Sequence, residues 1–486
     1  MDANRHIAKL EAALAERDAA LAARARELAE RDARIARLEA LVEELEGKLK
    51  ENSRNSGRPP SSDGPGRGKG KSSSRAKKGG GSGRKRGGQK GHTGHHRKMV
   101  PAEAVDHFVD LYPPVCSNCD AALPQRADPK AMRHQVTELP EPKPEVTEYR
   151  CHAVTCSCGQ QTRASLEGVA DSSFGPRLSA VVAMLTGVYH LSRRTTQKAL
   201  KELLGVDASL GAISKVEQRV SEALGAPVDE AWDKVQHAKV KHTDGTTWLE
   251  AGVTMQLWTI AAACATVFRI LTEATANSLR PLFGQRIGTL VSDRASALYF
   301  WAMDARQICW AHLLRRFVSF SQRDGPAGEH GRRLLDYTVL VFDYWQAYKD
   351  GAITRTKLIH WMSPLRRDLE AELEKATVRE LPGLSGSCRD ILHHRKALWT
   401  FVEEEDVEPT NNEAERELRS FVLWRKKCFG AQSTRGHLFA ERVMTVAHTA
   451  RKQDRPVLRF LTDACRARVV RGPAPSLFAS GPASTS

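Results

Sequence analysis

The sequence of 486 residues predicts a multidomain fold, in which an N-terminal coiled coil precedes a small β module, a helical domain and an α/β domain. Three observations support this prediction. Apolar residues recur every seven positions over the first 50 residues, five of the ten cysteines lie between residues 116 and 158, and short β-rich runs follow one another from residue 240. The predicted segments are residues 1–50, 51–100, 101–166, 167–236, 237–450 and 451–486.

The first segment carries a heptad repeat. The second core position of this repeat is Leu at both ends but Arg in the middle three heptads, so the central seam is half polar. The alternative is a single solvated helix rich in alanine and charge. Seven successive apolar residues at the first core position favour a coiled coil that joins copies of the chain. These residues are Ile7, Leu14, Leu21, Leu28, Ile35, Val42 and Leu49.

The next segment, residues 51–100, holds most of the net charge. The whole chain has 74 Lys and Arg against 58 Asp and Glu, a net charge of +16, which points to a polyanionic partner such as nucleic acid. Gly, Ser, Pro and basic residues dominate here, so we expect a disordered linker that contacts DNA phosphates. A solubilising linker is the alternative. The densest basic run supplies the candidate DNA contacts Arg84, Lys85 and Arg86.

No targeting or membrane segment is expected. No apolar run reaches the roughly 18 residues that a spanning helix needs. The N-terminus begins with charged residues rather than with the basic and apolar profile of a secretory signal. We therefore expect a cytoplasmic protein without membrane contact, whose cysteines are mostly reduced thiols.

Residues 101–166 are expected to form a zinc-binding β module. Zinc takes four tetrahedral thiolate or imidazole ligands, which small modules supply as two close pairs. The first pair, Cys116 and Cys119, has the usual two-residue spacer, whereas the second pair is one residue closer. We predict Zn²⁺ on Cys116, Cys119, Cys156 and Cys158, with Cys151 or His152 as the alternative to one member of the second pair. Free buried thiols are the alternative to a zinc site.

Residues 167–236 are expected to be helical and to resemble a helix-turn-helix. Helical spacing extends from residue 174 to 224, and within it residues 191–205 and 210–219 read as two helices joined by a short turn with Gly205. The second helix presents Lys215 as a candidate DNA contact. Plain helical packing accounts for the pattern nearly as well.

From residue 237 the pattern becomes α/β. Three β-rich runs, 241–248, 256–260 and 265–270, precede a short helix near 278–283 and a fourth run, 289–293. Asp244 lies on the first run and Asp293 ends the fourth. This order is typical of an RNase H-like α/β domain, in which two such aspartates bridge divalent cations.

A third carboxylate is needed to hold two Mg²⁺ ions. Magnesium prefers carboxylate oxygens and is completed by substrate phosphates, and two ions assist in-line phosphoryl transfer. The best candidate lies in a helix that begins near residue 411. Asn411, Glu415 and Arg419 are four residues apart and share one face of that helix, whereas Glu413 and Glu417 are the competing assignments.

Taken together, these motifs resemble the large transposase of the insertion sequence 66 family. The resemblance rests on Ser53 to Asp63 after the heptad helix, the cysteine module, Cys309-Trp-Ala-His312-Leu-Leu-Arg-Arg316 after Asp293, and Asn411-Asn-Glu-Ala-Glu415-Arg followed by Arg425-Lys-Lys. It extends to about residue 449. The family commonly has Glu after its first Asp, where this chain has Gly245.

The resemblance implies a DDE transposase, which cuts DNA at the ends of its element and joins the freed 3′ hydroxyls to target DNA. By motif, Asp244, Asp293 and Glu415 form the triad that holds Mg²⁺ or Mn²⁺. Cys309 and His312 match the block after the second Asp and are expected to shape the active site, together with Asn411 and Arg419. A packed helix with a buried His and a free Cys is the alternative for that block. The segment 321–407 resembles the family's helical insertion.

The implied partners are DNA, as terminal inverted repeats and as target, further copies of the chain through the coiled coil, and accessory proteins encoded by the element. The implied location is the bacterial cytoplasm, in association with the nucleoid. Two other functions fit the same residues. One is a DNA-binding regulator with an inactive catalytic domain, and the other is an RNase H-like nuclease that cuts without joining.

Overall fold

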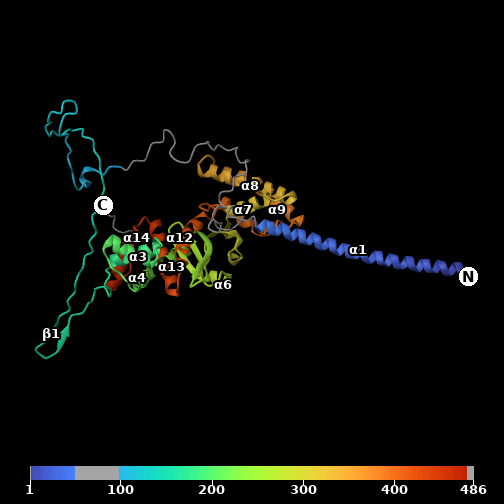
Figure 1. The fold of residues 1–486 in the computed structure, drawn as a ribbon, viewed down its shortest axis with the longest axis horizontal. Coiled ribbons are helices and arrows are strands. Elements are labelled where there is room, and N and C mark those ends of the chain that lie inside the picture. The colour runs from blue at the N-terminus through green and yellow to red at the C-terminus, as the bar shows by residue number, and fades with distance from the viewer. Residues whose placement is uncertain (1, 50–97, 479–486) are drawn as a thin grey trace. The chain divides into compact units, whose positions relative to one another are not determined.

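The computed structural model describes residues 2–49 and 98–478 and divides the chain into two compact units (Figure 1). One unit comprises residues 1–65 and 146–486, and the other comprises residues 66–145. Most of the predicted linker, with Arg84, Lys85 and Arg86, lies outside the described residues, as do the last eight residues of the predicted tail. In the described part of the chain, no helix combines the length and the hydropathy needed to cross a membrane.

The heptad segment forms one helix, α1 (Asp2–Leu49). Its apolar seam is open to solvent in the single chain, with Leu14 62% and Leu28 58% exposed. A coiled coil with another copy requires an apolar seam that is open in the single chain, and this helix meets that requirement. The coiled coil itself stays a prediction.

The cysteine segment has little regular structure. Residues 98–145 contain a short 3-10 helix, Ala102–Ala104, and an isolated antiparallel bridge between Val115 and Ala122 that closes a turn around the first cysteine pair. In the other unit, strands β1 (Ala153–Thr155) and β2 (Gln161–Arg163) form an antiparallel hairpin, and the second cysteine pair lies in its turn.

The helical region contains two capped helices where the helix-turn-helix pattern was predicted. Ser192 accepts a hydrogen bond from the Thr195 N–H at the start of α3, and Ser209 does the same for Ala212 at the start of α4. Gly205 ends α3 in the left-handed conformation that glycine adopts most easily. The elements of this region are α2 (Pro176–Ala183), a π-helical turn (Met184–Val188), α3 (Arg193–Leu204), α4 (Leu210–Ala223) and α5 (Gly225–Gln236).

A five-stranded mixed sheet forms the centre of the larger unit. Its order is β5-β4-β3-β6-β7, with β4 antiparallel to both β3 and β5, and with β3, β6 and β7 parallel. The three antiparallel strands are the predicted meander, and β6 is the predicted fourth run. The strands are β3 (Val240–Glu250), β4 (Val253–Ala261), β5 (Thr266–Leu271), β6 (Thr289–Ser292) and β7 (Arg306–Ile308).

Two of the later helices, α12 and α13, pack on this sheet. Helix α12 (Asn412–Cys428) packs on β3 and β4, and α13 (Thr434–Lys452) packs on β5 and on the earlier helices α4 and α5. Trp248 and Phe268 of the sheet meet Phe421 of α12 in aromatic contacts. The burial of these side chains holds α12 firmly beside β3. Short helical elements join the sheet strands: α6 (Ala276–Leu279), and 3-10 turns at Arg280–Phe283, Ser296–Leu298 and Met303–Ala305.

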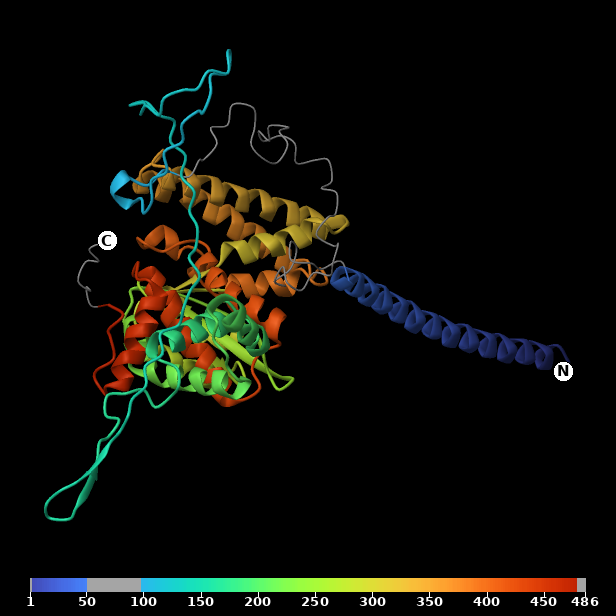
Figure 2. The same cartoon turned by 60° about the vertical axis from the view of Figure 1, so that its left-hand side comes forward.

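A second core lies among the helices between β7 and α12. Figure 2 shows α8 and α9 side by side, and α7 packs on α8. Leu313, Leu334, Leu369 and Trp399 are fully or almost fully buried in this core. Most of its helices lie within residues 321–407, and the insertion expected there stays a prediction. The helical elements of this core are α7 (Trp310–Ser321), α8 (Gly325–Lys349), α9 (Arg355–Val378), α10 (Ser385–His393), a 3-10 turn (Arg395–Leu398) and α11 (Thr400–Glu403). Helix α14 (Val457–Val469) is the last helix of the described residues.

Candidate active site

The two predicted aspartates lie on neighbouring strands. Strands β3 and β6 are parallel, with His242 opposite Val291 at the end of their paired region. Continuing this register by two residues places Asp244 opposite Asp293, the residue directly after β6. The Oδ1 atom of Asp293 accepts a hydrogen bond of 3.0 Å from the Ala295 N–H, which orients the carboxylate at the end of the strand.

Asn411 fixes the start of α12 against the first of these strands. Its Nδ2 atom donates a hydrogen bond of 2.7 Å to the carbonyl of Thr243, the residue before Asp244. Its backbone N–H points to the Cys309 Sγ atom at 3.2 Å, and its carbonyl accepts from the Glu415 N–H at 3.2 Å. Asn411 is fully buried. Because its side chain and backbone are both hydrogen-bonded, it fixes the position of the first turn of α12, from which the Glu415 side chain extends.

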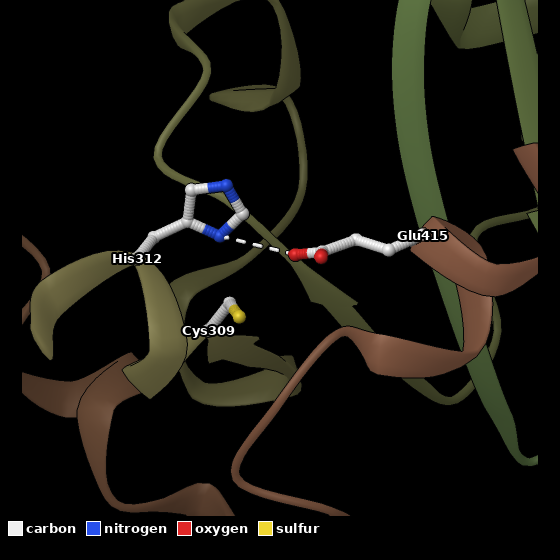
Figure 3. Close-up of side chains that lie close together, drawn as sticks. All are labelled: Cys309, His312 and Glu415. Atoms are coloured by element: carbon white, nitrogen blue, oxygen red, sulfur yellow. Dashed lines mark ion pairs between the residues drawn. The ribbon is translucent and has the colours of Figure 1, made fainter. Parts of the chain in front are cut away.

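Helix α7 supplies the side chains that face Glu415. Cys309 precedes this helix and is fully buried, and His312 lies in its first turn. One ligand atom each of Cys309, His312 and Glu415 lie within 4.8 Å of one another. Figure 3 shows the imidazole and the carboxylate pointing toward one another from different helices, with His312 Nδ1 and Glu415 Oε1 3.6 Å apart.

Arg315 also binds Glu415, and the sequence interpretation did not single it out. Its Nη2 atom lies 3.4 Å from Oε1 and 3.5 Å from Oε2 of that carboxylate. Arg315 follows His312 by three residues, which places both on one face of α7. This three-residue spacing is the sequence signal from which Arg315 could have been identified. Arg419, predicted beside Glu415, is exposed and makes no ion pair within the described parts of the chain.

The carboxylates repel one another. The pKa of Asp244 is raised from 3.8 to about 8, first by burial and then by the negative charges of Asp293 and Glu415. Arg315 and the hydrogen bond from the Gly245 N–H oppose this rise. The charges of Asp293 and Glu415 therefore reach Asp244, although the three acids come from β3, the end of β6 and α12.

The neighbouring groups of α7 are kept neutral. Burial lowers the pKa of His312, and the charge of Arg315 lowers it further, against the attraction of Asp293 and Glu415. Burial raises the pKa of the Cys309 thiol to about 11. A neutral imidazole and a protonated thiol leave the carboxylates as the negative groups of the site.

The structure separates Glu415 from the two competing glutamates of α12. Glu413 binds Lys452 of α13 with an N–O distance of 2.6 Å and also binds Arg416. Glu417 binds His448 of α13. These ion pairs lower the pKa of both glutamates even though burial acts in the opposite direction. Glu413 and Glu417 thus join α12 to α13, and Glu415 faces His312 and Arg315 of α7.

The residues of this site fit a divalent cation. Within the described residues, the Nδ1 atom of His312 is buried without a hydrogen-bond partner. The charges of Asp293, Glu415 and Arg315 act on Asp244, so the three carboxylates and one guanidinium belong to the same region. Carboxylate oxygens are the ligands that Mg²⁺ prefers, whereas the described residues whose ligand atoms lie within 4.8 Å of one another, and which could hold a metal ion, are Cys309, His312 and Glu415.

Gly245 has a local reason to be glycine. A Cβ atom at this position would lie 2.8 Å from the ring of Trp258 on the paired strand β4. A side chain after Asp244 is therefore excluded by the indole ring, which fills the space beside the backbone.

The cysteines predicted to bind zinc fall in both units of the chain. Backbone hydrogen bonds lower the pKa of the first thiol of each pair: those from Asn118 and Cys119 act on Cys116, and that from Cys158 acts on Cys156. Within each pair the turn geometry favours a thiolate, the form that binds zinc. The zinc site itself stays a prediction.

The predicted DNA contact of the helix-turn-helix pattern, Lys215, is exposed on α4. Arg435 of α13 binds the neighbouring Ser214 and Gln218, with distances of 2.9 and 3.2 Å.

Comparison with known families gives two matches. Residues 171–438, more than half of the chain, match a family described as Transposase IS66 family. Residues 6–98 match a family of unknown function, DUF6444. No curated protein matches the chain.

Proposed function

Because the chain belongs to the Transposase IS66 family, we propose that it cuts DNA at the ends of its element and joins the freed 3′ hydroxyls to target DNA. The observations that support this proposal are the register that sets Asp244 opposite Asp293 on neighbouring strands and the effect of the Glu415 charge, from α12, on Asp244. Family membership supports a transposase, and this geometry supports phosphoryl transfer at a carboxylate site in an RNase H-like domain.

Asp244, Asp293 and Glu415 would hold divalent cations, with Mg²⁺ or Mn²⁺ as the candidates. When bound, such ions would supply charge neutralisation at the phosphate and acidify the attacking oxygen. The three side chains reach this arrangement from separate elements, so each depends on the packing that holds its own element in place.

The remaining side chains position these acids. Asn411 joins α12 to the backbone beside Asp244, and it thereby fixes the distance between the first and third carboxylates. Arg315 offsets the charge of Glu415 before any cation arrives. Cys309 is buried and His312 lies beside Glu415, and the ligand atoms of these three residues are close enough together to hold a metal ion.

Exposed cations on α12 are suited to contact the phosphates of DNA. Arg416, Arg419, Lys426 and Lys427 are exposed and recur at helical spacing along one side of the helix. Together with Lys215 of α4 and the basic linker, they supply the sequence-independent part of DNA binding. We expect binding to weaken steeply with salt for this reason.

Two further parts of the proposal concern assembly. The open seam of α1 supports pairing with other copies of the chain. The two close cysteine pairs support a structural Zn²⁺ ion. Accessory proteins encoded by the element remain a further expectation.

The test uses a labelled DNA that carries one end of the element and an unlabelled target plasmid. We expect Mg²⁺-dependent cleavage at the end, followed by a labelled product joined to the plasmid. Asp293→Asn should abolish both products while DNA binding persists. Unchanged cleavage by this variant would contradict the assignment of the triad.

The same assay separates the two other functions. A nuclease would produce the cut but no joined product, and a regulator with an inactive catalytic domain would bind the DNA without cutting it. Inverted repeats in the DNA that flanks the gene would supply the correct substrate and would independently support an element end.

A further inference from the structure

Two exposed aromatic side chains lie at one place where α12 ends. Phe429 follows α12 and is 70% exposed, and Tyr189 follows the π-helical turn and is 53% exposed. The residues beside them touch: the Cys428 Sγ atom lies 3.4 Å from the carbonyl of His190, and His190 stacks on Trp424 with ring centroids 5.0 Å apart. Tyr189 and Phe429 are thus the sequence neighbours of two residues, His190 and Cys428, that contact each other from distant parts of the sequence.

The backbone at this place is unusual. Phe429 has φ +56° and His190 has φ +58°, both in the left-handed region that favours glycine. A helix that ends in this conformation commonly uses glycine there, and the chain has Gly430 only one position later. π-helical turns such as Met184–Val188 are rare and frequently mark functional sites. Phe429 is both strained and exposed, so burial of its ring does not offset the cost of its backbone conformation. This combination favours a role in contact with another molecule.

Phe429 is held firmly despite its exposure. Ala431 donates a hydrogen bond of 2.9 Å to the Leu249 carbonyl and accepts one of 2.9 Å from the Ala251 N–H. At Gly430 a Cβ atom would lie 2.2 Å from the Leu249 carbonyl oxygen, so the loop lies tight against the end of β3. The loop after α12 therefore presents the Phe429 ring from a fixed backbone.

The surroundings of these rings are basic. Lys426 and Lys427 are exposed in the last turn of α12, and the charge of Lys427 is close enough to lower the pKa of His190. Cations beside exposed aromatic rings form the pattern by which proteins bind unpaired nucleotides, with phosphates on the cations and bases stacked on the rings.

We propose that Tyr189 and Phe429, with Lys426 and Lys427, bind unpaired bases of the DNA that is processed in the active site. This inference rests on the proposed function and adds a substrate feature to it, namely locally unpaired DNA. Fourteen residues of α12 separate Glu415 from Phe429, a rise of about 21 Å at 1.5 Å per residue. DNA that follows α12 would therefore bring a base about six nucleotides from the cut phosphate to the Phe429 ring, at about 3.4 Å per nucleotide.

The experiment measures DNA binding by fluorescence anisotropy with the full chain in EDTA, where no cleavage occurs. One probe is a fully paired duplex that carries the element end, and the other has four mismatched thymines about six nucleotides from the cut position. We expect the mismatched probe to bind at least about fivefold more tightly, because stacking of one base on an aromatic ring contributes at least that factor.

Three variants of Phe429 separate stacking from folding. Phe429→Gly relieves the left-handed strain, so it should unfold at the same or a higher temperature and yet lose the preference for the mismatched probe. Phe429→Leu should also lose it, whereas Phe429→Trp should keep it. Tyr189→Ala should reduce the preference, and Val378→Ala, which truncates a side chain that is 81% exposed on α9, should not change it.

The inference is overturned if the unsubstituted chain binds both probes equally, or if Phe429→Gly and Phe429→Leu keep the preference. If cleavage in Mg²⁺ persists in either of those cases, the proposed function stands and only the stacking surface fails. If the chain binds neither probe, both the stacking surface and the proposed function fail.

Discussion

Replacing Asp244 by Asn should stabilise the protein in the absence of divalent cations while abolishing cleavage. The folded chain holds this carboxyl at a pKa of about 8, against an ordinary value of 3.8. Because the pKa is raised on folding, the folded state binds the extra proton between these values, and stability falls as pH rises through that window. One pKa unit corresponds to about 1.4 kcal/mol, so Asp244 costs on the order of 4 kcal/mol at pH 7. Asn carries no such cost.

Thermal unfolding in EDTA, measured from pH 4 to pH 9, tests this expectation. The melting temperature of Asp244→Asn should equal that of the unsubstituted chain near pH 4 and exceed it by several degrees at pH 8. Mg²⁺ should raise the melting temperature of the unsubstituted chain more than that of the variant. Asp343→Asn, at an exposed position of α8 without an ion pair in the described residues, controls for the loss of one charge.

Two results would refute this reasoning. A melting temperature of Asp244→Asn that is lower than that of the unsubstituted chain at pH 8 would mean that the carboxylate is stabilised rather than strained in the folded state. A difference that does not vary between pH 4 and pH 9 would mean that the proton is not the cause.

Three further predictions concern the supports of the site. Gly245→Ala should destabilise the chain by about 1–3 kcal/mol in chemical denaturation, because the added Cβ atom meets the Trp258 ring. Trp258→Leu in the same chain should restore part of the lost stability. If Gly245→Ala leaves the stability unchanged, the ring is able to move. Asn411→Ala should lose the hydrogen bond to Thr243 and lower the free energy of unfolding by about 1–3 kcal/mol. It should reduce cleavage more than DNA binding, and equal losses of cleavage and DNA binding would argue against a positioning role. The purified chain should contain one Zn²⁺ by elemental analysis, and Cys116→Ser should lose it; a metal content that the substitution leaves unchanged would exclude this ligand.

The heptad helix, the meander and the late helix with its glutamates followed from residue patterns because their periodicity is local. Strand β7 did not, since it is only three residues long and two of them are polar. Its Arg306 is buried because it binds the Ser292 hydroxyl at 3.1 Å and the Asp293 carbonyl at 2.8 Å, and Gln307 accepts a hydrogen bond from the Phe401 N–H. The hydropathy pattern of the sequence does not reveal such tertiary hydrogen bonds.

The candidate site was predictable in its members but not in its contacts. Spacing identified Asp244, Asp293 and Glu415 as candidates, but three glutamates alternate at the start of α12 and their directions depend on what packs against each side. Ion pairs with α13 turn Glu413 and Glu417 away from the site, and only the fold supplies them. The role of Arg315 likewise depends on how α7 lies against α12.

The central claim is that Glu415, rather than its neighbours, completes a carboxylate site with Asp244 and Asp293. Its most direct test is Mg²⁺-dependent cleavage of a labelled element end by Glu415→Gln and by Glu413→Gln, two changes of the same chemistry on one helix. The proposed site predicts that Glu415→Gln binds the DNA but does not cut it, and that Glu413→Gln still cuts. Cleavage by Glu415→Gln at the rate of the unsubstituted chain would contradict it.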